Sequence, residues 1–256
     1  MIHPTAIVHP GAVLGPGVEI GPFCLIGEHV TIGRDTKVLG HCVINGWTTI
    51  GEECIIYPFA AIGGPSQDKK AVEGEVSYVM IGDRCVIREY VTVNRATGEG
   101  QSTIVGNDCW LLAYTHVSHN SRLGNGVTMS NLAQLAGHCI VEDNVTIGGQ
   151  AGVHQFVRIG RLAMVGGATK VARDVPPFFL CDGSPAAIFG LNKIGLQRAG
   201  INGEAQAELK EAYKVLYRSN RNLSQALAVL VDKVQTPEGR ELVNFLSAES
   251  KRGILK

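Results

Sequence analysis

Aliphatic residues recur at every sixth position along the first two thirds of this 256-residue chain. One run extends from Ile2 to Ile62, and a second run from Ile81 to Val171 skips only position 99. Because six is neither the 3.6-residue period of an α-helix nor the two-residue period of a strand, it indicates a repeat of one short strand and one turn. Three such units would close one triangular coil of eighteen residues.

A second inward position follows four residues after each aliphatic one, and it usually holds a small side chain. Examples are Ala6, Ala12, Val18, Thr48, Ala60, Thr115, Ala133 and Ala151. Two side chains per strand would then fill a narrow prism while the others face outward, which predicts a parallel β-helix of hexapeptide repeats. Glycine often follows the aliphatic residue, as at Gly21 and Gly33. We expect these glycines to serve corners that need unusual backbone angles.

The six-residue period is interrupted twice, over residues 64–79 and 98–103, and both segments are predicted to be loops ejected from a coil. Such excursions from a rigid scaffold often carry binding groups. The repeat ends near Pro176 and Pro177. We therefore expect a β-helix domain over residues 1–183 and a second domain over residues 184–256.

The second domain has helical patterning. Asn202 is a candidate N-cap for a helix over residues 204–219, whose apolar face is Leu209, Tyr213, Leu216 and Tyr217. Another helix is predicted from Leu223 to Val234. Thr236 and Pro237 are typical of the cap and first residue of a last helix.

Charge and hydropathy exclude several classes of function. The 23 basic and 23 acidic residues balance, so no broad basic surface is present to attract nucleic acid or an acidic membrane. The sequence from Met1 already lies within the repeat, and no apolar window approaches the length of a membrane span. We expect a cytoplasmic protein that does not insert into membranes.

The cysteines fit the repeat better than they fit disulfides or a metal site. Six of the seven occupy the small inward position, and only Cys181 lies outside the repeat; the six are Cys24, Cys42, Cys54, Cys85, Cys109 and Cys139. Buried free cysteines behave as small apolar side chains. We interpret them as inert residues of the core, as expected in a reducing compartment.

Candidate chemistry is concentrated among the histidines between residues 116 and 154. Residues eighteen apart should stack at about the 4.8 Å spacing of neighbouring strands. His119 would then lie beneath Gly137, with Gln155 next in the same column, while His116 would share a column with Gln134. A base beside an unobstructed backbone N–H is the minimum apparatus for acyl transfer to a hydroxyl or amine.

Two other classes of protein have to be weighed. Some trimeric hexapeptide β-helices, such as the carbonic anhydrases of this shape, bind metal through histidines of two chains. Here no cysteine would face outward, and His116 and His119 are closely spaced for two ligands of one metal on a flat strand, so no metal site is expected. A catalytically silent scaffold is the remaining alternative.

The sequence resembles the UDP-N-acetylglucosamine acyltransferases that start lipid A synthesis. The resemblance extends nearly from end to end of the chain. The segments that carry it are residues 87–97 (IREYVTVNRAT), 113–120 (AYTHVSHN), 135–138 (LAGH), 153–156 (VHQF), 164–167 (MVGG), 174–177 (DVPP) and 192–200 (NKIGLQRAG).

The resemblance implies a left-handed parallel β-helix with a C-terminal α-helical domain, assembled as a homotrimer with active sites between subunits. It implies transfer of a 3-hydroxyacyl group to the 3-hydroxyl of UDP-N-acetylglucosamine. The acyl donor would be carried on the phosphopantetheine of acyl carrier protein, and no metal or redox cofactor would be required.

The resemblance also implies residue roles. His119 would be the general base, and the Gly137 N–H would stabilise the oxyanion. The sugar and diphosphate would contact Asp68, His116, His138 and Gln155, and the nucleotide or its phosphates would contact His154, Asn192 and Arg198. Lys70 would contact the acyl donor, and Gly167 would limit the length of the acyl chain.

Four positions depart from the family pattern: Asn120, Asn94, Ile194 and Ala199. Asn120 stands where the family usually has an aspartate, so the base would lack a charged partner. A histidine followed by asparagine also resembles the related N-acyltransferase of the same pathway, and the alternative is therefore acylation of a 3-amino UDP-sugar or a glucosamine amine. The VHQF segment and the helical C-terminus favour O-acyl transfer.

Overall fold

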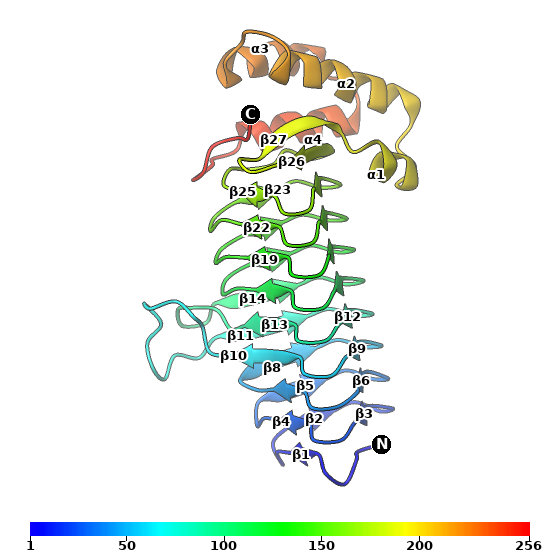
Figure 1. Ribbon diagram of the computed structural model, residues 1–256, viewed down its shortest axis with the longest axis vertical. Helices are drawn as coiled ribbons and strands as arrows, with labels where there is room; N and C mark the ends of the chain where they lie inside the picture. The colour runs from blue at the N-terminus through cyan, green and yellow to red at the C-terminus, as the bar shows by residue number, and fades with distance from the viewer.

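The computed structural model describes residues 1–256, and its strands stack into a long three-sided column (Figure 1). Each coil contributes one strand to each of three sheets. The first sheet contains β1 (Ile7–Val8), β4 (Leu25–Ile26), β7 (Val43–Ile44), β10 (Ala61–Gly64), β13 (Thr92–Asn94), β16 (His116–Val117), β19 (Gln134–Leu135), β22 (Gly152–Val153) and β25 (Lys170–Val171). The second contains β2 (Val13–Leu14), β5 (Val30–Ile32), β8 (Trp47–Ile50), β11 (Tyr78–Ile81), β14 (Ser102–Val105), β17 (Arg122–Leu123), β20 (Ile140–Val141) and β23 (Arg158–Ile159).

The third sheet begins with β3 (Glu19–Ile20) and ends in the C-terminal part of the chain. It continues through β6 (Lys37–Val38), β9 (Ile55–Ile56), β12 (Val86–Ile87), β15 (Trp110–Leu111), β18 (Thr128–Met129), β21 (Thr146–Ile147), β24 (Met164–Val165), β26 (Phe179–Asp182) and β27 (Ala187–Leu191). All pairings are parallel except the last, because β27 turns back against β26. The predicted parallel β-helix of hexapeptide repeats is confirmed.

The eighteen-residue register also agrees with the sequence. His116 pairs with Gln134, and Gln134 pairs with Gly152. The sixth-position aliphatic residues are almost completely buried from Ile20 onward, and they form one core along the column axis with the small inward residues. Outward side chains in neighbouring coils are therefore held in fixed columns by the backbone ladder.

All seven cysteines are free and buried. Burial raises the pKa of the Cys139 and Cys181 thiols to about 12. Cys181 differs from the prediction in one respect, because it lies in β26 beside Val165 and so occupies the aliphatic position of one further rung. This rung was not predicted, because Pro176 and Pro177 interrupt the six-residue period just before it.

The expectation for the corner glycines was wrong. Gly21 and Gly33 do not have a positive φ; the left-handed positions are three residues after the aliphatic one and hold side chains such as Phe23 and Asp35. Glycine is required instead because the next coil is too close for a side chain. A Cβ on Gly33 would lie 2.6 Å from the carbonyl carbon of Gly51, and one on Gly21 would collide with the carbonyl oxygen of Leu39.

Two excursions leave the column, as predicted, but both are offset from the expected residues. The long one connects β10 to β11 through residues 65–77 and projects sideways from the column (Figure 1), and the short one connects β13 to β14 through residues 95–101. Strand pairing extends further into both interruptions than the lost period indicates, with Tyr78 paired to Trp47 and to Ser102.

Helices cover the C-terminal end of the column (Figure 1): α1 (Lys193–Arg198), α2 (Gly203–Tyr217), α3 (Leu223–Lys233) and α4 (Pro237–Ser247). The three longer helices were predicted, and the side chains of Asn202 and Thr236 cap α2 and α4 as expected. Neither α1 nor β27 was predicted from the sequence. The expected division at residues 183 and 184 falls between β26 and β27.

The helices are joined to the column by an ion pair and a hydrogen bond. The Arg161 guanidinium pairs with Glu241 of α4. Arg158, whose Nε lies 2.7 Å from the fully buried carboxylate of Asp174, donates through Nη2 to the carbonyl of Phe245 in α4. These contacts fix the end of the column on which the site below is built. None of the four helices has both the length and the apolar character required to cross a membrane.

Candidate active site

The candidate site lies at the corner between the first and second sheets, where the chain turns from β16 into β17. His119 stands at this corner with only 9% of its surface exposed. Its Nδ1 lies 2.9 Å from Oδ1 of Asn120. The neighbouring residue therefore contacts one ring nitrogen and leaves Nε2 without a protein partner.

Gly137 occupies the same corner one coil later, and the imidazole ring of His119 lies directly over it. A Cβ added to Gly137 would collide with Cε1 and Nε2 of that ring. The predicted column is therefore correct, but Gly137 is buried by the ring rather than unobstructed. Its N–H donates to no protein acceptor, whereas the flanking N–H groups of Ala136 and His138 bond to Val153 and His119.

An open groove of about 580 Å³ extends along the first sheet beside this corner. It brings together five of the expected site residues, His116, His119, Gly137, His154 and Gln155. Gln67 from the long excursion and Lys170 from β25 complete its polar lining. The groove thus combines an imidazole with a free ring nitrogen, an unpaired backbone N–H and several hydrogen-bonding side chains.

The pKa values of two histidines are lowered. Burial and the nearby His119 lower the pKa of His116, whose Nδ1 lies 2.7 Å from the Thr92 hydroxyl. Burial, His119 and Lys251 lower the pKa of His138, against an opposing effect of the Asp68 carboxylate. Both imidazoles are therefore favoured in the neutral form, in which each can accept as well as donate a hydrogen bond.

His138 faces the other side of the corner. With Asn120, Arg122 and Lys251 it lines a second cavity of about 370 Å³ over the second sheet. Its ring stacks on Phe156, with ring centroids 4.7 Å apart. Its ring centroid also lies 5.3 Å from that of His119, edge-on, so His138 adjoins His119 on the side away from the groove that holds His116 and His154.

Two expected residues lie on the long excursion. Asp68 is half-buried, and its carboxylate accepts a hydrogen bond from the backbone N–H of Lys70, whose side chain is exposed. The backbone N–H of Asp68 donates to the Ser66 hydroxyl, which lies 2.7 Å from the hydroxyl of Thr97 next to the catalytic corner. The excursion thus reaches the site, although Lys70 contacts no other expected site residue.

The remaining expected residues lie at other corners. Asn192 caps α1, and its side-chain amide donates to the carbonyl of Leu162 at the corner between the second and third sheets. Arg198 follows at the exposed end of α1. Gly167 is exposed at the corner between the third and first sheets. One chain therefore does not bring these three residues to His119.

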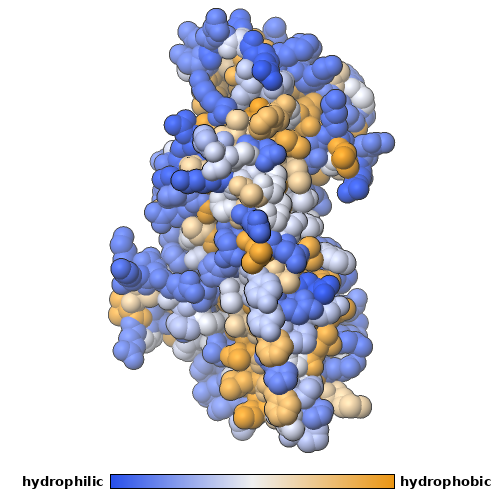
Figure 2. All heavy atoms as spheres, in the orientation of Figure 1, coloured by the Kyte–Doolittle hydropathy of each residue, from blue (hydrophilic) through white to orange (hydrophobic).

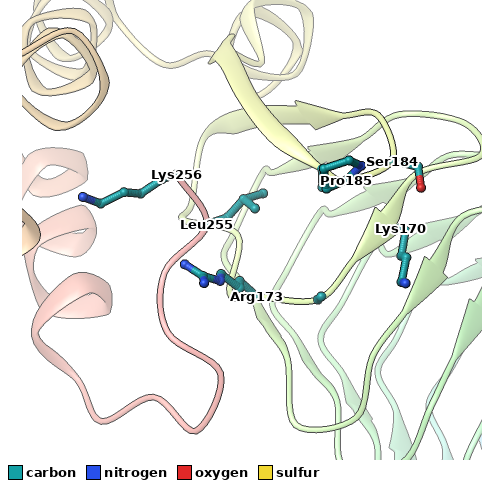
Figure 3. Close-up of a pocket in the computed structure, with 8 residues that line it drawn as sticks. Lys170, Arg173, Ser184, Pro185, Leu255 and Lys256 are labelled. Carbon is teal, nitrogen blue, oxygen red and sulfur yellow. The ribbon is translucent and has the colours of Figure 1, made fainter.

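A cationic pocket of about 500 Å³ adjoins the groove at its C-terminal end (Figure 3). Lys170 lines both spaces, and Arg173, Ser184, Pro185 and Lys256 lie around the pocket. Sequence reasoning missed Lys170, although residues 116, 134, 152 and 170 form one column of eighteen-residue steps that could have identified it.

Comparison with known proteins places this architecture in a family. Residues 174–255 match the model of the second domain of UDP-N-acetylglucosamine O-acyltransferase, and residues 1–34 and 29–64 match bacterial transferase hexapeptide repeats. The acyl-[acyl-carrier-protein]–UDP-N-acetylglucosamine O-acyltransferase of Gloeothece citriformis is 48% identical over 96% of this chain and 88% of that protein. The chain belongs to this O-acyltransferase family.

Other members agree along the whole chain. The O-acyltransferase of Thermodesulfovibrio yellowstonii is 46% identical over 100% of this chain and 99% of its own length. The crystal structure of the Francisella novicida UDP-N-acetylglucosamine acyltransferase superposes with a TM-score of 0.97 at 34% identity, covering 100% of this chain and 94% of that one. The left-handed β-helix with C-terminal helices that the resemblance implied is thereby confirmed.

Two departures from the family pattern have structural roles here. Asn94 is buried, and its side-chain amide donates to the carbonyl of Pro65, where the long excursion begins. Asn120 is hydrogen-bonded to Nδ1 of His119 although it carries no charge. Ile194 is exposed on α1, and Ala199 is the C-cap of that helix; nothing in the structure explains these two residues.

The family assignment separates this protein from the carbonic anhydrase alternative. Within one chain, no three His, Cys, Asp or Glu side chains converge as a group that could hold a metal ion. His116 and His154 instead line the groove as separate hydrogen-bonding groups beside His119. This arrangement suits hydrogen bonding to a polar substrate.

Proposed function

We propose that this protein transfers a 3-hydroxyacyl group from acyl carrier protein to the 3-hydroxyl of UDP-N-acetylglucosamine, the first step of lipid A synthesis. The names of its relatives supply the donor and acceptor classes. The observation that carries the proposal is the position of His119, whose Nε2 is free and whose ring lies beside the unpaired Gly137 N–H.

In the proposed reaction, the sugar hydroxyl attacks the thioester carbonyl while Nε2 of His119 takes the hydroxyl proton. The tetrahedral oxyanion accepts a hydrogen bond from the Gly137 N–H. When the C–S bond breaks, the proton on Nε2 passes to the departing thiolate, so the products are an ester and a free thiol. No metal or redox cofactor is needed for this sequence.

The other site residues are assigned to binding. We place the sugar and diphosphate against Asp68, His116, His138 and Gln155, and the nucleotide against His154, Asn192 and Arg198. Lys70 is assigned to the donor, and Gly167 to the end of the acyl chain. The cationic pocket around Lys170 and Arg173 supports a phosphate-bearing donor, because neither side chain is engaged in an ion pair.

A homotrimer would unite residues that one chain keeps apart, since Asn192 and His119 lie at different corners. Exposed apolar side chains also gather over the N-terminal coils (Figure 2). They include the stacked ladder of Phe23, His41, Phe59, Tyr90 and Tyr114, flanked by Leu25 and Val43. A second copy of the chain is the occupant that we propose for this surface, and a solution mass three times the 27.3 kDa of one chain is expected.

The proposal is tested by incubating the purified protein with 3-hydroxyacyl thioesters of acyl carrier protein and either UDP-N-acetylglucosamine or its 3-amino analogue. The expected product is the 3-O-acyl sugar nucleotide, identified by mass spectrometry and alkaline lability. Acylation of the amino sugar alone would establish the N-acyltransferase alternative instead. No acylated product with either acceptor would contradict the proposed function.

A further inference from the structure

The side-chain amide of Asn120 is held on both sides by one backbone residue, Thr97. Its Oδ1 accepts the Thr97 N–H at 2.9 Å, and its Nδ2 donates to the Thr97 carbonyl at 3.1 Å. A flipped amide would set donor against donor and acceptor against acceptor, so the two contacts fix which atom is oxygen. The backbone N–H of Asn120 is held as well, by the buried Thr103 hydroxyl at 2.9 Å.

This orientation determines the state of His119. The atom 2.9 Å from Nδ1 is Oδ1, which has no proton to give, so Nδ1 must carry the proton. In the neutral ring the lone pair is then on Nε2, where a general base needs it. An aspartate at position 120 would place an oxygen against the Thr97 carbonyl, so an amide matches this backbone better than a carboxylate does.

Thr97 is itself tied to the excursion that carries the expected substrate residues. Its hydroxyl lies 2.7 Å from the hydroxyl of Ser66, which also accepts the backbone N–H of Asp68 at 3.2 Å. Around this link, the N–H of Gly98 donates to Glu75 at 3.0 Å. The two excursions therefore form one hydrogen-bonded unit, and that unit holds Asn120.

We propose that Thr97 is a positioning residue for the reaction: its backbone N–H and carbonyl select, through Asn120, the His119 tautomer protonated at Nδ1, and its hydroxyl couples that selection to the Asp68 excursion through Ser66. The inference rests on the proposed role of His119 as base. It goes beyond that role because it assigns the orientation of the base to a residue that contacts neither the substrate nor the imidazole.

The direct test is the ¹⁵N chemical shifts of the His119 ring in the full-length protein at a pH where the ring is neutral. The parent should show a protonated Nδ1 and an unprotonated Nε2. Asn120→Ala should shift the ring towards a mixture of tautomers, whereas Thr97→Ser, which keeps the hydroxyl, should match the parent. A parent ring protonated at Nε2, or an unchanged ring in Asn120→Ala, would overturn the proposal.

Kinetics test the coupling to Ser66. Thr97→Val removes only the hydroxyl, and we expect it to lower kcat by roughly 10-fold, a part of the roughly 10²- to 10⁴-fold that a positioned base supplies. KM for the UDP-sugar should change by less than about twofold, and Thr97→Ser should restore kcat, because orientation rather than binding is lost. Parent kcat in folded Thr97→Val would contradict the coupling.

The role of His119 as base and the role of Thr97 in positioning can be refuted independently. Parent-like turnover in His119→Ala would remove the base and leave the ¹⁵N result standing as a structural fact. A parent ring protonated at Nε2, together with an inactive His119→Ala, would keep the base and refute the role of Thr97. Circular dichroism and solution mass of each variant confirm that it is folded before either comparison is made.

Discussion

The imidazole of His119 covers Gly137 in the next coil so closely that no side chain fits between them. The β-helix makes this contact by its register, because residues eighteen apart in these coils are neighbours along one corner. A proton acceptor and a free backbone donor are thereby held together without a flexible loop. Such fixed placement is what a base and an oxyanion donor require.

Gly137→Ala is expected to reduce turnover by roughly 10²-fold or more, within the range that a positioned general base supplies, because alanine keeps the backbone N–H but disturbs His119. A single methyl group suffices because it would displace the His119 ring, and the positive-φ restriction on side chains does not apply at this position. Turnover of Gly137→Ala is to be compared with that of Gly203→Ala, whose new methyl group would meet no atom within 4 Å. Equal activity of the two variants would refute the close contact.

The stability of the protein should depend on pH through His116. Its pKa is lowered in the folded state by burial, so below the ordinary histidine value of about 6.5 the unfolded chain binds the proton more readily. The free energy of unfolding should therefore fall as the pH drops from about 6.5 through the lowered folded pKa. Denaturant titrations at a fixed protein concentration measure this slope.

His116→Gln gives the matched comparison for that slope, since glutamine is neutral at every pH used. The variant should lose less stability than the parent between about pH 6.5 and pH 5, while the stability difference between the two proteins should stay constant above about pH 7.5. Parallel stability curves for parent and variant across the acidic range would show that His116 is not the group responsible.

Gly167→Met is expected to shorten the preferred acyl chain, because a side chain there would fill the end of the hydrocarbon site. The variant should fold, since a Cβ at this exposed position would come no closer than 3.4 Å to a neighbouring atom, the Gly149 carbonyl oxygen. The measurement is product mass after competition among thioesters of different length. An unchanged distribution of products counts against the assigned role.

The seven thiols should be unreactive while the protein is folded. Burial raises the pKa of Cys139 and Cys181 to about 12, which suppresses the nucleophilic thiolate. The hydrogen bond with Cys42 lowers the pKa of Cys24 to about 7, but Cys24, like the other six, is buried and out of reach of a reagent. An aromatic disulfide reagent should therefore modify no thiol in native protein at neutral pH and all seven in guanidinium chloride. Rapid modification of native protein would show that a thiol is accessible.

Much of the fold could be predicted because the spacing of a hexapeptide repeat determines which residues pair in neighbouring coils. The period alone gave the three-sided column and the stacking of His119 under Gly137. The additional rung at Cys181 was not predicted, because two prolines interrupt the period just before it. The corner glycines were misinterpreted because two different constraints, crowding between coils and a positive φ, both select glycine.

The site was predicted where it follows the columns and missed where it depends on irregular backbone. Lys170 could have been found by counting eighteen residues from Gly152. Thr97 could not be found, because it holds Asn120 through its backbone N–H and carbonyl, which nearly every residue type supplies. From the sequence, Asn120 was expected to leave His119 without a charged partner. The position of the Thr97 carbonyl, which accepts a hydrogen bond from the side-chain amide, explains why an asparagine is suited to this position.

The most direct test of the central claim is the turnover of His119→Ala with a 3-hydroxyacyl thioester of acyl carrier protein and UDP-N-acetylglucosamine. His9→Ala, which changes an exposed histidine in the N-terminal coils, is the control. The account predicts a loss of roughly 10²- to 10⁴-fold in His119→Ala, with the fold and solution mass unchanged, and parent-like turnover in His9→Ala. Turnover in His119→Ala within a few-fold of the parent would contradict the assignment of His119 as the base.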